Sequence, residues 1–170
     1  MADRKDSAPG PAVAGEPDEY EVKLAEFEYA IWHLGAAFAR WRRDCLAAAS
    51  DVGLSSTEAS ILHAVHMYGV AKGIMEISRL LHRDDLANIQ YGLKKLAQLG
   101  LIEKQGNSRK NMTYVASAKG NAVVDAYLDQ RRKVLLRLFK HVSPSPSDLT
   151  DLIMRMHVMI GVYDQSIDLI

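Results

Sequence analysis

The sequence lacks the features that mark disulfide-rich, membrane-spanning and secreted proteins. Its 170 residues include a single cysteine, Cys45, so no internal disulfide can form. No apolar run reaches the roughly 18 residues that span a bilayer, and no apolar signal core stands near the start. We therefore expect a cytoplasmic protein with no membrane partner.

The motifs of common enzymes are also missing. The chain has no glycine-rich phosphate loop, no Ser/His/Asp signature and no cluster of metal-ligand residues. His63 and His66 stand three residues apart, a spacing that could serve a metal, but no carboxylate or cysteine accompanies them and ordinary capping or surface histidines explain it as well. We expect a protein that is not an enzyme and holds no metal or cofactor.

The net charge is zero, but the charges are unevenly distributed. Residues 1–49 carry six Lys or Arg and nine Asp or Glu, residues 50–142 carry fourteen and eight, and residues 143–170 carry one and four. The net charges of these segments are therefore −3, +6 and −3. A cationic middle between two acidic ends places the attraction for an anionic partner in the centre of the chain.

The rest of the chain is organised around residues 74–117. A short amphipathic run at 74–81 is followed by a polar turn and by a second helical run at 85–99, which Gly100 ends. Two short strands are expected at 101–105 and 111–116, joined by a polar turn. Helix, turn, helix and basic hairpin predict a winged helix-turn-helix that lays one helix in the DNA major groove.

The second of these helices has two distinct faces. Its inner face is apolar, with Leu86, Ile89, Leu93 and Leu96 at helical spacing. Asparagine and glutamine on the outer face have the donor–acceptor pair that reads adenine, and lysines reach phosphates. The predicted contacts with double-stranded DNA are Arg83, Asn88, Gln90, Tyr91, Lys94, Lys95, Arg109 and Lys110.

Two acids at the start of this helix leave an alternative open. Asp84 and Asp85 would repel phosphate, which favours a winged-helix protein-interaction module without sequence-specific DNA binding. An acid at a helix N-terminus is also an ordinary cap, and aspartate can accept a hydrogen bond from cytosine. A third possibility is a small-molecule sensor or enzyme with a crevice lined by aromatics such as Trp32, Trp41, Tyr68 and Tyr127.

The segments on either side of the central one are predicted to form a tail and long helices. Residues 1–17 are rich in Pro, Gly, Ala and charge and predict a disordered tail. A helix is expected at 18–50, with large apolar residues alternating at steps of four and three, and Ser55 with Glu58 predicts a capping box before the next helix. Helices are expected at 118–141 and 147–170, the last again with an apolar seam. We assign residues 18–50 and 118–170 to a homodimer interface and 51–117 to DNA binding.

The central segment resembles the DNA-binding domain of the MarR family of bacterial transcription regulators. The similar pieces are the spacing of Ile77, Leu80 and Leu81, the runs Leu86-Ala87-Asn88-Ile89 and Leu93-Lys94-Lys95-Leu96 leading into Gly100-Leu101-Ile102, and Val115-Ala116-Ser117-Ala118-Lys119-Gly120. The turn at residues 106–110 departs from the Asp-x-Arg usual in that family.

The resemblance implies a mainly α fold with a small β-hairpin wing and with N- and C-terminal dimerisation helices. It also implies a homodimeric transcription regulator, open to control by a small-molecule effector. Some MarR-like regulators sense oxidants through a cysteine, which gives Cys45 a second interpretation beside that of a small buried residue.

Overall fold

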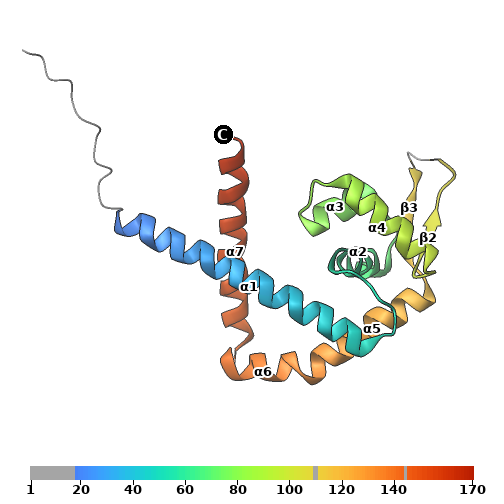
Figure 1. The fold of residues 1–170 in the computed structure, drawn as a ribbon, viewed down its shortest axis with the longest axis horizontal. Coiled ribbons are helices and arrows are strands. Elements are labelled where there is room, and N and C mark those ends of the chain that lie inside the picture. The colour runs from blue at the N-terminus through green and yellow to red at the C-terminus, as the bar shows by residue number, and fades with distance from the viewer. Residues whose placement is uncertain (1–17, 109–110, 144) are drawn as a thin grey trace, which may run out of the picture. The chain divides into compact units, whose positions relative to one another are not determined.

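The computed structural model of the chain describes residues 18–108, 111–143 and 145–170 (Figure 1). Within these residues the chain forms seven α-helices, a turn of 3-10 helix and three strands. In chain order they are α1 (Glu19–Ala49), α2 (Ser56–His66), η1 (Met67–Gly69), β1 (Lys72–Gly73), α3 (Ile74–Leu81), α4 (Leu86–Gln98), β2 (Ile102–Gln105), β3 (Thr113–Ala116), α5 (Ala118–Lys133), α6 (Leu135–Val142) and α7 (Pro146–Ile167). No described helix is long and apolar enough to cross a membrane.

The chain divides into two compact units, residues 1–40 and 41–170. The described part of the first is the N-terminal portion of α1, whose side chains are mostly exposed. The second unit contains the end of α1 and every later element. Arg42 joins α1 to α2, donating through Nη2 to the Ser60 hydroxyl at 2.5 Å, while Cys45 and Leu46 are buried beside it. The predicted tail, residues 1–17, lies outside the described residues.

The predicted fold class is confirmed: the chain is mainly α-helical with a small antiparallel sheet. The sheet has three strands in the order β1-β3-β2, and the predicted hairpin is β2 and β3, with Lys104 opposite Tyr114. The third strand was not predicted. It is the dipeptide of β1, where Lys72 pairs with Tyr114 and Gly73 with Thr113.

The core lies where α2 packs against α3, α4 and α5. The predicted inner face of α4 is confirmed at Ile89, Leu93 and Leu96, which have no exposed surface, whereas Leu86 is half-buried at the edge. Gly92 lets α4 approach α2 closely, because a Cβ there would lie 2.4 Å from Cδ1 of Ile61.

The helix α4 ends at the glycine that was predicted to stop it. Gly100 has φ +69°, in the left-handed region that glycine tolerates. The Leu101 amide donates to the Leu96 carbonyl at 2.9 Å and the Gly100 amide to Ala97 at 3.1 Å. This pair of bonds is a Schellman motif, which turns the chain from α4 directly into β2.

Other local predictions fare differently. The capping box is confirmed, since the Ser55 amide donates to Glu58 Oε2 at 2.8 Å and the Glu58 amide to the Ser55 hydroxyl at 3.3 Å. The single helix expected at 118–141 is wrong. The chain turns at Val134 (φ −109°, ψ −68°), which separates α5 from α6.

A lysine is buried in the core. Lys72 has no exposed surface, and its Nζ donates to the carbonyls of Val65 at 3.3 Å, Val70 at 3.0 Å and Met67. These carbonyls lie at and just beyond the C-terminus of α2, where a cation offsets the helix dipole and satisfies carbonyls that lack helical partners. Lys72 thus fixes β1 against α2.

Candidate nucleic-acid interface

The helix-turn-helix is formed by α3, a short polar turn and α4. His82 ends α3 in the left-handed conformation, with φ 51°. The Arg83 amide donates to the Ser78 carbonyl at 3.0 Å, and the Ser78 hydroxyl donates back to the carbonyl of Arg83. These bonds hold the turn, so α4 leaves α3 in a fixed direction.

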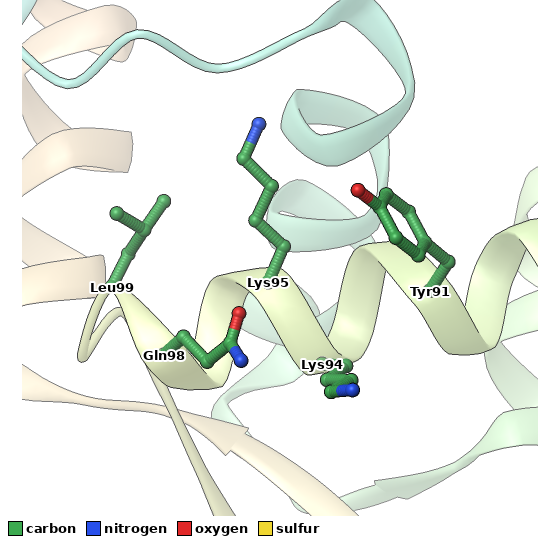
Figure 2. Close-up of a pocket in the computed structure, with 5 residues that line it drawn as sticks. All are labelled: Tyr91, Lys94, Lys95, Gln98 and Leu99. Atoms are coloured by element: carbon green, nitrogen blue, oxygen red, sulfur yellow. The ribbon is translucent and has the colours of Figure 1, made fainter.

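The outward surface of α4 is polar and borders shallow hollows. One, of about 320 Å³, is lined by Tyr91, Lys94, Lys95, Gln98 and Leu99, and Figure 2 shows the two lysines pointing in different directions from the helix. A second, of about 340 Å³, lies between α4 and the sheet and is lined in part by Gln90, Tyr91, Lys94 and Lys104, and a third, of about 560 Å³, shares Gln90 and Lys104 with it. Tyr91 is 68% exposed. Gln90, Tyr91 and Lys94 are therefore outside the core and grouped on one accessible surface.

Lys95 has a partner outside α4. Its Nζ lies 2.9 Å from Oε1 of Glu58, whose side chain is only 6% exposed. Burial raises the pKa of Glu58, but hydrogen bonds from Lys95 and Ser55 outweigh burial, so the pKa lies below its ordinary value. Lys95 is thus engaged in tying α4 to the first turn of α2, a role that the sequence did not suggest.

The start of α4 holds a second polar network. Both carboxylate oxygens of Asp85 accept hydrogen bonds from Arg83, one of them from Nε at 2.7 Å, and Asn88 Nδ2 donates to Oδ2 at 3.0 Å. Asp85 occupies the N-cap position, but its side chain makes no capping hydrogen bond. The ordinary cap expected of an acid at this position is therefore not what the Asp85 side chain forms.

Two of the predicted DNA contacts belong to the predicted wing, and the structure adds a third residue there. Arg109 and Lys110 lie outside the described residues. Lys104, which the sequence analysis did not select, is exposed on β2 and lines the same hollows as Gln90. The signal was available, because residues 103–105 are all polar and a lysine on the strand that follows a recognition helix is well placed to reach phosphate.

The cysteine and two of the histidines lie where the end of α1, α2 and α5 meet. The Cys45 thiol is buried and donates to the Tyr127 carbonyl at 3.8 Å, and burial raises its pKa. His63 Nδ1 lies 2.9 Å from the Ala59 carbonyl and its ring packs edge-on against Tyr127 with centroids 4.6 Å apart, while His66 Nδ1 contacts Asn121 at 3.0 Å. A buried thiol of raised pKa is poor in the reactive thiolate, which favours the structural role of Cys45.

Comparison with known families adds to this geometry. Residues 54–120, which contain α2 through the start of α5, match the family described as winged helix DNA-binding domain. This segment is similar to winged-helix DNA-binding domains and has their order of helices and strands. The match includes both networks at α4 and the hollow beside the wing. No curated protein sequence matches the chain.

Solved structures share the fold well beyond the winged helix. A MarR family regulator from Neisseria meningitidis is 17% identical, with a TM-score of 0.69 over 86% of this chain and 96% of its own. A MarR family regulator from Silicibacter pomeroyi is 16% identical, with a TM-score of 0.62 over 79% and 87%. One from a Rhodococcus species is 13% identical, with a TM-score of 0.64 over 80% and 93%. The chain has the fold of MarR family transcription regulators.

Proposed function

We propose that the protein is a dimeric, sequence-specific DNA-binding transcription regulator of MarR type. The observation that supports this most is the surface of the winged-helix domain. There Gln90, Tyr91 and Lys94 of α4 and Lys104 of β2 stand exposed around one hollow, on the helix that follows the turn and on the wing. In helix-turn-helix proteins this second helix enters the major groove with its first turns.

In this proposal the surface groups divide by task. Gln90 has the donor–acceptor pair for an adenine edge, and Tyr91 offers an apolar ring beside a hydroxyl. Lys94 and Lys104 line the same hollow as Gln90 and supply cations for the DNA backbone, and the sequence predicts the same role for Arg109 and Lys110. Lys95 contributes through its bond to Glu58, which keeps α4 in place, rather than through phosphate.

The alternative of an interaction module without DNA binding loses part of its support. Asp84 and Asp85 motivated that alternative because free carboxylates would repel phosphate. In the structure the carboxylate of Asp85 is paired with the guanidinium of Arg83, so this pair presents little net charge to a strand, whereas Asp84 is exposed. The charge of the central segment also favours an anionic partner, because residues 50–142 carry a net +6.

The dimer in this proposal is built mainly from α1 and α7, two of the helices outside the winged-helix domain. Every residue of α7 from Asp151 onward is exposed in the single chain, including Leu152 at 51% and Met159 at 37%. The α1 residues Leu34 and Phe38 are likewise 59% and 53% exposed. Apolar faces of this length are typical of a surface that a second copy covers. A two-fold axis between the copies would set the spacing of two recognition helices. Control by a small effector remains part of the proposal.

Salt dependence tests the phosphate contacts. Each lost contact is expected to reduce the slope of log affinity against log salt by about 0.9, because one fewer counterion is released. Because each substitution is present in both copies of the dimer, Lys94→Ala should lower the slope by about two contacts and Arg109→Ala with Lys110→Ala by about four, measured by titrating a random-sequence duplex with the full-length protein. Lys133→Ala, on the exposed end of α5, removes the same charge outside the interface and should leave the slope unchanged. Slopes equal to wild type in both interface variants would place α4 and the wing away from DNA.

A further inference from the structure

The network at the start of α4 connects the domain interior to a predicted base-reading side chain. Asp85 Oδ2 accepts from Asn88 Nδ2 at 3.0 Å, while the Arg83 guanidinium binds both oxygens of the same carboxylate. Arg83 Nη1 in turn lies 3.4 Å from the hydroxyl of Thr57 on α2. The contacts thus run from α2 through the turn to the first turn of α4.

The guanidinium is a rigid anchor for Asp85. Its side chain is 29% exposed and that of Asp85 is 35% exposed, so the pair is partly withdrawn from solvent. A planar guanidinium that binds two carboxylate oxygens fixes the plane of the carboxylate as well as its position. The backbone of Arg83 is also held, by the two hydrogen bonds that it exchanges with Ser78.

The ionised carboxylate determines which way the Asn88 amide faces. Hydrogen bonds from Arg83 and Asn88 lower the pKa of Asp85 to about 2, so the group is ionised near neutral pH. An ionised carboxylate accepts hydrogen bonds and donates none. Only the NH₂ group of Asn88 can therefore face Asp85, and the Asn88 carbonyl oxygen must point elsewhere.

The groups that remain on Asn88 match one base. One N–H is used by Asp85, which leaves the second N–H and the carbonyl oxygen of an exposed side chain. Adenine presents an acceptor at N7 and a donor at N6 in the major groove, and asparagine reads it through that same pair. A free amide would rotate by 180° and offer donor and acceptor in either order, so a fixed amide discriminates better.

We infer that Arg83 and Asp85 are positioning residues that preset the Asn88 amide for reading a base in the major groove. The inference rests on the proposed function, since it assigns a role within DNA recognition. It changes the role predicted for Arg83, from direct contact with DNA to orientation of Asn88 through Asp85. It also explains why an acid is present beside the expected path of a phosphate backbone.

Selection of sites from a random-sequence duplex pool by the full-length protein tests the inference. Asn88→Ala should relax the preference at one base-pair position in each half-site. Asp85→Asn keeps almost the same shape, but its neutral amide can face Asn88 with either a donor or an acceptor. This variant should therefore lower the base preference at that same position by at least about fivefold. The double variant should be no worse at that position than Asn88→Ala alone, because both changes remove one interaction. The affinity of Asp85→Asn for unselected DNA should be equal or higher, since a negative charge is lost.

Two controls separate this role from a merely structural one. Asp129→Asn breaks another Arg–Asp ion pair, the exposed contact of Arg132 with Asp129 on α5, and should leave every base preference intact. Thermal unfolding of each variant shows whether the fold is kept, and Arg83→Lys, which keeps the charge but loses the two-point contact, should relax the same position as Asp85→Asn.

The outcomes are distinguishable from failure of the proposed function. If the wild-type protein selects no site, the proposed function fails and the inference fails with it. If the wild type selects a site and Asn88→Ala relaxes one position that folded Asp85→Asn and Arg83→Lys leave unchanged, the inference alone is overturned. A position relaxed by Asp85→Asn but not by Asn88→Ala would equally overturn it, because Asp85 would then act without Asn88.

Discussion

A variant carrying Leu152→Glu and Met159→Glu is expected to sediment as a monomer and to bind DNA far more weakly. Both side chains are exposed on one face of α7 in the single chain, where the proposed second copy would cover them. Two carboxylates buried in an apolar interface would lose hydration without gaining a partner. On a duplex selected by the wild type, we expect the apparent affinity to fall about 10²–10⁴-fold, because the second winged helix would no longer bind as part of the same molecule.

The matched control carries two glutamates on the opposite side of the same helix. His157 and Gln165 lie roughly half a turn from Leu152 and Met159 at about 3.6 residues per turn, so His157→Glu with Gln165→Glu adds acids without touching the apolar seam. Analytical ultracentrifugation at micromolar concentration compares the two variants with the wild type. A wild-type chain that sediments as a well-behaved monomer would contradict the dimer.

Gly120→Ala is expected to destabilise the winged-helix domain by about 2–4 kcal/mol. This is more than overpacking usually costs, because the added methyl group would clash with backbone that cannot move aside. A Cβ at Gly120 would lie 2.0 Å from the carbonyl oxygen of Leu101. That oxygen is held, because it accepts the Ser117 amide at 3.0 Å, while the Ser117 hydroxyl caps Gly120 at 3.0 Å and donates to the Gly100 carbonyl at 2.6 Å. The start of α5 and the start of β2 would have to separate.

Urea denaturation of Gly120→Ala beside Gly53→Ala measures this effect. Gly53 lies in the loop before α2, where an added Cβ would have no atom of another residue within 4 Å apart from its chain neighbours. The same substitution there should therefore change the free energy of unfolding by less than about 0.5 kcal/mol. Equal midpoints for the two variants would show that the close approach of α5 to β2 does not contribute to stability.

Local sequence signals predicted α4 well. The spacing of Ile89, Leu93 and Leu96 indicated which side of α4 is buried, and Gly100 marked the turn into β2. Both signals act within a few residues, since helical periodicity and a left-handed glycine need no distant partner. The long apolar seams at either end of the chain likewise predicted helices near the observed bounds of α1 and α7.

The features that sequence patterns missed depend on partners far along the chain or on geometry without a pattern. The strand β1 is only Lys72 and Gly73, and it exists because β3 pairs with it. Lysine usually stays in water, so the burial of Lys72 follows only from three carbonyls that converge on it. The break at Val134 has no proline or glycine to announce it.

The candidate site shows the same division. Gln90 and Lys94 were predicted as outward groups from helical spacing, and the structure places them there. Lys95 was assigned to phosphate because it is also polar and on α4, but its partner Glu58 stands far earlier in the chain, on α2. Arg83, Asp85 and Asn88 are close neighbours in the chain, yet the sequence could not show whether the acid would cap, repel or orient.

Selecting binding sites from a random-sequence duplex pool, with full-length wild type and Gln90→Ala side by side at one salt concentration, tests the central claim most directly. We predict that the wild type enriches a site with two related half-sites about one helical turn apart or a multiple of it. Gln90→Ala should lose about 1–3 kcal/mol of discrimination at one position per half-site and keep its affinity for unselected DNA. A wild-type protein that enriches no sequence, while folded and able to bind DNA, would contradict sequence-specific recognition by α4.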